Sequence, residues 1–97
     1  MSFKSKKLRD SARGMDCTMN VHGICSYNNE TTVLSHINTE GGCMGGKSDD
    51  FSAVFSCAAC HSWLDQNIGT ELDRLFYTRR ALIKTWRVWI ENGLFKI

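Results

Sequence analysis

The chain has 97 residues, no proline and a formal net charge of +2. This length allows one small domain and excludes two independent cores. Hydrophobic residues make up 42% and charged residues 23%, a globular composition that excludes wholesale disorder. The longest apolar runs are too short for a membrane span, and no apolar stretch follows the basic N-terminus as it would in a secretory signal. We therefore expect a soluble, cytoplasmic protein without a membrane partner.

Charge is distributed unevenly along the chain. Residues 1–14 carry five basic side chains and one acidic side chain. Residues 15–50 carry one basic and five acidic side chains, and residues 51–97 carry six basic and four acidic side chains. Basic ends suit a polyanion, and carboxylates between them suit a cation. A solvated surface would produce the same pattern, so charge alone leaves both interpretations open.

The first half of the chain predicts an arm and two strands. Residues 1–14 form a basic N-terminal arm or helix, which Gly14 would end. Residues 31–37 are β-branched and partly alternating, and predict a strand. A glycine-rich loop over residues 41–46 leads to a second, short apolar strand over residues 51–56.

The second half predicts two helices. A short helix follows the second strand, and a long amphipathic helix begins after Thr70 and ends at Gly93. Apolar residues recur along it at spacings of three and four, which predicts a buried stripe. This stripe comprises Leu72, Leu75, Phe76, Leu82, Ile83, Trp86 and Ile90. We expect one α+β domain over residues 1–97, with a core over residues 15–66 and the long helix over residues 70–93.

The five cysteines favour a metal site. Cys57 and Cys60 form a CxxC knuckle, whose two thiolates can face one ion. Zinc takes four such ligands, and Cys17 and Cys25 are the natural second pair, although seven residues separate them. Cys43 is then a buried thiol, a free thiol, or a ligand in place of Cys17 or Cys25. An odd count without an export signal disfavours a disulfide framework, and a redox role would need a βαβ context that is absent.

Two histidines suggest a hydrolytic site. His36 ends the first predicted strand, and His61 directly follows Cys60 at the start of the short helix. A strand histidine that faces a helix histidine can activate water near neutral pH and help to hold a divalent cation. Taken alone, His36 is better explained as a strand-end residue bonded to backbone, and His61 as a zinc ligand or a helix-start contact.

The order of these features resembles the HNH endonucleases (His-Me finger or ββα-metal nucleases), and more closely a group of small phage- and prophage-encoded nucleases of that type. The similarity runs from about Leu8 to His61 and, more loosely, into the C-terminus. It rests on the segments ARGMDC, HGIC, TTVLSHI, the GGC loop and CAACH. The resemblance implies a treble-clef-like ββα-metal fold, with a structural Zn²⁺ held by Cys17, Cys25, Cys57 and Cys60.

The resemblance also implies catalytic roles. His36 would be the general base that activates water, and His61 would bind a catalytic Mg²⁺ or another divalent cation with Asp50 assisting. Many members carry an aspartate ligand directly before the first histidine, where this chain has Ser35. The expected activity is metal-dependent DNA cleavage. The alternative, favoured by Ser35, is an inactive zinc module that binds DNA or a recombination or replication protein.

DNA is the expected partner, because basic side chains supply phosphate contacts that do not depend on sequence. A homodimer through unused aromatic surface is also compatible with the sequence. The basic side chains expected to contact DNA are Lys4, Lys6, Lys7, Arg9, Arg13, Arg80, Lys84 and Arg87.

Overall fold

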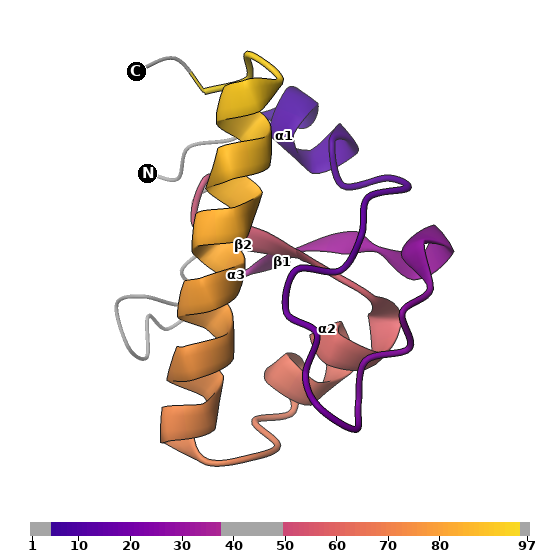
Figure 1. Ribbon diagram of the computed structural model, residues 1–97, viewed down its shortest axis with the longest axis vertical. Coiled ribbons are helices and arrows are strands. Elements are labelled where there is room, and N and C mark those ends of the chain that lie inside the picture. Colours follow the sequence, from indigo (N-terminus) through magenta and orange to yellow (C-terminus); the bar gives the residue numbers. More distant parts are fainter. Residues whose placement is uncertain (1–4, 38–49, 96–97) are drawn as a thin grey trace.

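The computed structural model describes residues 5–37 and 50–95, so Lys4, Cys43 and the predicted glycine-rich loop lie outside the described residues. Three helices, a short 3-10 helix and a two-stranded hairpin make up this part of the chain (Figure 1). In chain order they are α1 (Lys6–Asp10), η1 (Asn29–Thr31), β1 (Val33–His36), β2 (Ala53–Ser56), α2 (Ala58–Asp65) and α3 (Glu71–Glu91). The predicted small α+β architecture with a long C-terminal helix is confirmed.

The hairpin has two differently covered faces. β1 and β2 are antiparallel, with Leu34 opposite Phe55 and Ser35 opposite Val54. Because successive side chains of a strand alternate, these two pairs lie on opposite faces. Val54 packs in a cluster with the cysteines and α2, whereas Leu34 and Phe55 pack with Leu8 of α1 and the C-terminal end of α3. The hairpin therefore separates two small cores.

The boundaries of α3 follow from its terminal residues. The Thr70 hydroxyl accepts the N–H of Asp73, and the Asp73 carboxylate accepts the N–H of Thr70, which forms a capping box. Gly93 lies just beyond the C-cap and has φ of +76°, a conformation that costs glycine little. The predicted long helix is confirmed at both ends.

The predicted buried stripe of α3 is wrong. The buried side chains of α3 are Thr78, Ala81, Thr85 and Trp89, whereas most members of the predicted stripe are exposed. The reason is that α3 lies along the edge of β2, where the Phe55 N–H donates to the Thr85 hydroxyl at 3.2 Å. Close approach to the strand at Thr85 requires a small side chain with a polar acceptor, which hydropathy does not select.

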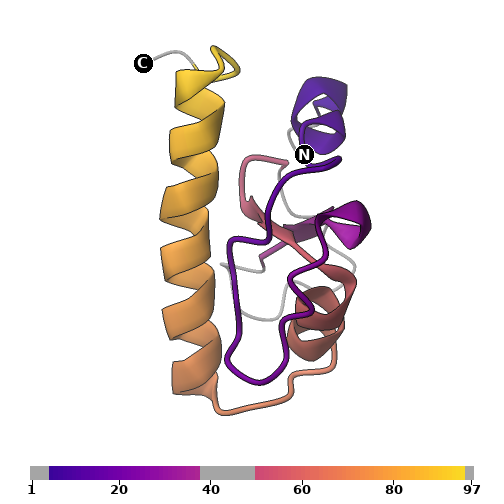
Figure 2. The same ribbon diagram turned by 45° about the vertical axis from the view of Figure 1, so that its right-hand side comes forward.

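The N-terminal segment is part of the fold. Leu8 and Ala12 are buried, and the Trp89 indole N–H donates to the Ser11 hydroxyl at 2.7 Å. Figure 2 shows that α3 borders the molecule on one side and that α1, α2 and the hairpin all lie on the same side of this helix. Within the described residues, none of the helices has both the length and the apolar character that a membrane span requires.

Candidate functional site

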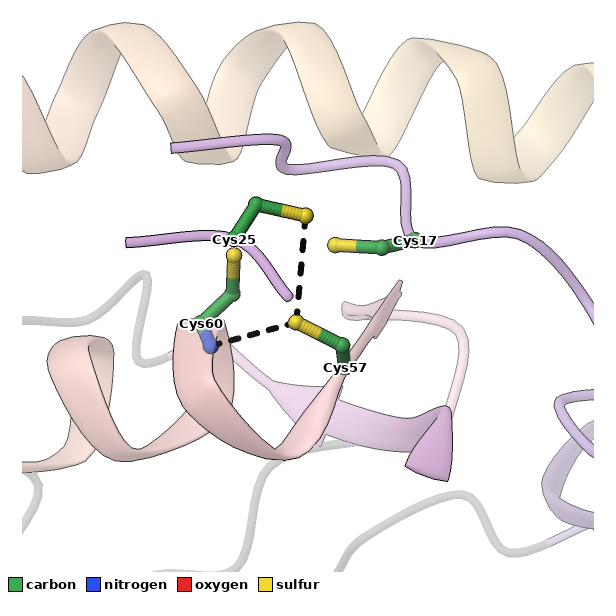
Figure 3. Close-up of side chains that lie close together, drawn as sticks. All are labelled: Cys17, Cys25, Cys57 and Cys60. Atoms are coloured by element: carbon green, nitrogen blue, oxygen red, sulfur yellow. Dashed lines mark hydrogen bonds between the residues drawn. The ribbon is translucent and has the colours of Figure 1, made fainter. Parts of the chain in front are cut away.

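Four cysteines converge where the loop before the hairpin meets the start of α2. The Sγ atoms of Cys17, Cys25, Cys57 and Cys60 all lie within 4.8 Å of one another (Figure 3). Cys25 and Cys57 have an Sγ–Sγ distance of 3.8 Å, far beyond the ~2.05 Å of a disulfide. It equals the edge of about 3.8 Å that zinc–sulfur bonds of ~2.3 Å give in a tetrahedron. These four side chains could hold a metal ion.

Amide groups around this cluster point at the sulfurs. The N–H groups of Asn20 and Tyr27 each donate at 3.4 Å, to Cys17 and Cys25 respectively. The N–H of Cys60 donates to Cys57 at 3.5 Å. Asn20 and Tyr27 have positive φ values of 46° and 55°, a left-handed backbone that costs a non-glycine residue about 1 kcal/mol or more. The loop thus adopts an unfavourable conformation that places donors on the thiolates.

Burial makes it difficult to charge all the thiols together. Burial raises the pKa of Cys60, and the neighbouring Cys17 raises it further. Burial also acts to raise the pKa of Cys57, but hydrogen bonds involving Ser26 and the Cys60 N–H outweigh it and lower that pKa to about 6. A bound dication would offset the repulsion among several thiolates, so the cluster has the electrostatic character of a cation site.

A second feature joins His36 to a buried carboxylate. His36 Nε2 lies 2.8 Å from Oδ1 of Asp50, whose side chain is 1% exposed. Oδ2 accepts the N–H of Ser5 at 2.6 Å and lies 3.5 Å from Nε of Arg9. Burial acts to raise the pKa of Asp50, but the hydrogen bonds from His36 and Ser5 and the charges of His36 and Arg9 lower it overall. Asp50 is therefore ionised at neutral pH.

His61 contacts the residue next to His36. His61 is the fourth residue after the Cys57 N-cap of α2, and its Nδ1 lies 2.7 Å from the Ser35 hydroxyl. The Ser35 hydroxyl is also bonded to the Ser56 hydroxyl. Side chains of Ser35 and His36 leave opposite faces of β1, because they are consecutive strand residues. The structure thus pairs His36 with Asp50 and His61 with Ser35. The position of Asp50 suits orienting His36 rather than assisting an ion on His61.

A cleft of about 380 Å³ lies between the end of β1, the C-terminal end of α2 and the N-terminal end of α3. His36 lines it, and its side chain is 35% exposed, so the imidazole is open to solvent. Asp65, Glu71 and Arg74 also line the cleft, and Arg74 donates to backbone carbonyls of the α2–α3 connection. The sequence pattern did not predict this cleft, because its walls come from segments that only the tertiary fold brings together.

The basic side chains expected at DNA lie in different environments. Lys6, Lys7 and Arg13 are exposed at α1, and Lys84 and Arg87 are exposed on α3. Arg9 is also exposed but lies against Asp50. In contrast, Arg80 donates to the carbonyl of Met19 at 2.7 Å, and its guanidinium lies 5.3 Å from the ring centroids of Phe76 and Tyr77. These contacts give Arg80 a structural position.

Known proteins resemble this chain over most of its length. Residues 6–94 match a family model described as "Putative nuclease YbcO". The chain is 34% identical over 94 residues to "Putative nuclease YbcO" of Escherichia coli (strain K12) and to "Putative nuclease ybcO" of Enterobacteria phage 82. Each alignment covers 92% of this chain and 96% of the relative. A solved structure described as "Structure of a putative bacteriophage protein from Escherichia coli str. K-12 substr. MG1655" superposes with a TM-score of 0.75 at 28% identity, and covers 90% of this chain and 100% of that chain.

Proposed function

The chain belongs to the family described as "Putative nuclease YbcO", and from this membership we propose that it is a metal-dependent DNA endonuclease of the HNH type, encoded by a phage or prophage. The observation that carries the proposal is the pair of contacts at the end of β1, where a phosphate would have to reach both faces of the strand to meet His36 and His61. His36 is held by an ionised carboxylate, and the preceding residue, Ser35, contacts His61 on α2. The names of the relatives support nuclease activity, and the β1–β2–α2 order supports the HNH type.

In this proposal, His36 is the general base. Ionised Asp50 can only accept hydrogen bonds, so it holds the proton of His36 on Nε2 and leaves the lone pair on Nδ1. Nδ1 can then take a proton from a water molecule that attacks the phosphate. The Asp50 carboxylate stabilises the imidazolium that forms, as a carboxylate does when it orients a catalytic histidine.

Ser35 and His61 are the side chains that would hold a catalytic cation. Their donor atoms are a hydroxyl oxygen and an imidazole nitrogen, and within residues 5–37 and 50–95 no carboxylate bonds to His61. Mg²⁺ prefers carboxylate oxygens, whereas Mn²⁺, Co²⁺ and Ni²⁺ accept imidazole more readily. The donor set therefore fits these ions better than Mg²⁺. Such a cation supplies charge stabilisation for the phosphate and the leaving oxygen.

Zinc is the ion we propose for the four-cysteine cluster, because four thiolates at tetrahedral spacing are typical of structural zinc. It would join the loop over residues 17–25 to the start of α2 and so stabilise a small core. DNA would be bound through phosphate contacts from the exposed basic side chains at α1 and on α3.

One observation favours a second function. Ser35 occupies the position where an acidic ligand would strengthen a catalytic metal site, and a hydroxyl is a weak substitute. The protein would then be an inactive zinc module that binds DNA or a recombination or replication protein.

Plasmid nicking separates the two functions. Supercoiled plasmid is incubated with the parent or His61→Ala protein in Mn²⁺, Co²⁺, Mg²⁺ or EDTA, and DNA binding is measured by mobility shift. The nuclease proposal predicts nicking by the parent with Mn²⁺ or Co²⁺, a loss of roughly 100-fold or more in His61→Ala, and equal DNA binding by both. Binding without nicking under every metal would establish the inactive module instead.

A further inference from the structure

The outer side of α3 carries an apolar stripe. Its large apolar side chains are between 37% and 75% exposed. They are Leu72, Phe76, Ile83, Trp86 and Ile90. Figure 2 shows that this helix borders the molecule on one side, and its buried residues Ala81, Thr85 and Trp89 account for the inner side. Trp86 also packs within its own chain, because its indole N–H donates to the Phe51 carbonyl at 2.9 Å. The exposed parts of the other side chains are surplus to the core of the described residues.

The spacing of this stripe is that of a helix-pairing seam. Positions 72, 76, 79, 83, 86 and 90 are separated by alternating steps of four and three residues. This heptad spacing keeps one side of a helix continuously against a second helix. Arg79 is the one charged residue in the series, and a polar residue within such a seam lowers stability while restricting the partner and register.

We propose that α3 pairs with α3 of a second copy of this chain, antiparallel, to form a homodimer. The seam is symmetric about the level of Ala81. A two-fold axis there places Leu72 beside Ile90 of the partner subunit and Phe76 beside Trp86 of the partner subunit. Self-complementarity of this kind is what a two-fold interface requires. The antiparallel direction also brings Asp73 near Arg87 of the partner subunit, whereas a parallel pair would place identical charges side by side.

The available surface is large enough for a dimer. The exposed parts of the five apolar seam side chains amount to roughly 600 Å² in each chain, at the upper end of the ~300–600 Å² of the largest patch on a typical monomer. Two such faces would bury about 1,200 Å², at the lower end of the ~1,200–2,000 Å² of stable complexes. This proposal does not depend on the nuclease proposal, because none of its seam residues is among the proposed catalytic or metal-binding side chains.

Light scattering coupled to gel filtration tests the dimer on the full chain. Twice the chain mass of 11.0 kDa is expected for the parent at micromolar concentration. Ile83→Glu should produce a monomer, and Arg79→Leu should tighten the dimer about tenfold because it completes the seam. Ile68→Glu is the matched control, since Ile68 is an exposed isoleucine outside the seam, and it should stay dimeric. Circular dichroism confirms that each variant is folded.

The direction of pairing has its own test. Leu72→Glu and Ile90→Lys should each weaken the dimer, and the double variant should restore it, because antiparallel pairing places the two new charges together twice. A parallel pair would be weakened further by the double variant. A parent protein that is monomeric at 100 μM would overturn the proposal. The same holds if that monomer binds anionic lipid vesicles through this face, because the stripe would then be a lipid-binding surface.

Discussion

Nε2 of His36 lies 2.8 Å from Oδ1 of Asp50, and this contact connects the exposed end of β1 to a carboxylate buried beneath α1. The same carboxylate accepts the N–H of Ser5 at 2.6 Å. Asp50 therefore orients a histidine at the cleft and also fixes the N-terminal segment to the hairpin. A single buried carboxylate serves the proposed base and the fold.

Asp50 should make stability depend on pH in the acid range. Its pKa is lowered from the ordinary 3.8, so its contribution is fully present above that value and is lost as the pH falls through the lower folded-state pKa. Asp50→Asn should lower the free energy of unfolding by about 2 kcal/mol at pH 7, because hydrogen bonds to a charged acceptor are lost. Urea unfolding from pH 7 to pH 2.5 should show the difference between parent and variant shrinking below about pH 4. A constant difference over this range would contradict the ionised carboxylate.

Ser35→Asp should strengthen the proposed catalytic metal site. The new carboxylate would lie near His61 and add the ligand type that Mg²⁺ prefers. We expect divalent cations to bind more tightly and nicking with Mg²⁺ to increase about tenfold. The metal-free protein should be less stable, because the new carboxylate is buried. Ser35→Asn is the control, since it has nearly the same shape without the charge. Equal metal affinity in the two variants, measured by isothermal titration calorimetry, would show that no cation binds between Ser35 and His61.

Removal of the structural metal should unfold the core. Native mass spectrometry is expected to find one zinc per chain, lost in Cys25→Ser and Cys57→Ser but retained in Cys43→Ser. Loss of zinc should lower Tm by more than about 10 °C, because metal binding contributes directly to folding in small domains. Full zinc occupancy in Cys57→Ser would contradict the four-cysteine site.

Thr85 should contribute more to stability than its polarity suggests. Its hydroxyl accepts the N–H of Phe55 and also lies 3.2 Å from the Thr18 hydroxyl. Thr85→Val keeps the shape but leaves a buried N–H unpaired, at an expected cost of about 1–3 kcal/mol. Thr78→Val is the matched control, because the Thr78 hydroxyl bonds only to carbonyls of its own helix and its loss should cost under ~1 kcal/mol. Equal unfolding free energies for the two variants would contradict the role of Thr85.

Local signals in the sequence were sufficient for several elements. Thr70 and Gly93 bound α3 because capping depends on neighbouring backbone groups. The strands follow from β-branched and apolar runs, and CxxC spacing correctly paired Cys57 with Cys60 in a cluster that could hold a metal. In each case the determining contacts lie within a few residues or follow from ligand chemistry.

The tertiary contacts could not be predicted in the same way. The inner side of α3 uses Thr85 to pair with a strand edge, so hydropathy selected the wrong side of the helix. Arg80 was expected at DNA, but its guanidinium is bonded to the Met19 carbonyl, 61 residues earlier in the chain. Burial of Asp50 under α1 likewise depends on the packing of the N-terminal segment, which charge patterning described only as a basic arm.

Plasmid nicking by His36→Ala decides whether His36 is the base of a DNA-cleaving site. The parent, His36→Ala and His22→Ala proteins are purified identically and assayed with Mn²⁺, and mobility shifts confirm equal DNA binding. His22 is an exposed histidine in the loop before the hairpin and controls for loss of an imidazole and for contaminating nucleases. We predict that His22→Ala nicks plasmid at the parental rate and that His36→Ala is slower by about 100-fold or more. Equal rates for the parent and His36→Ala would contradict the assignment.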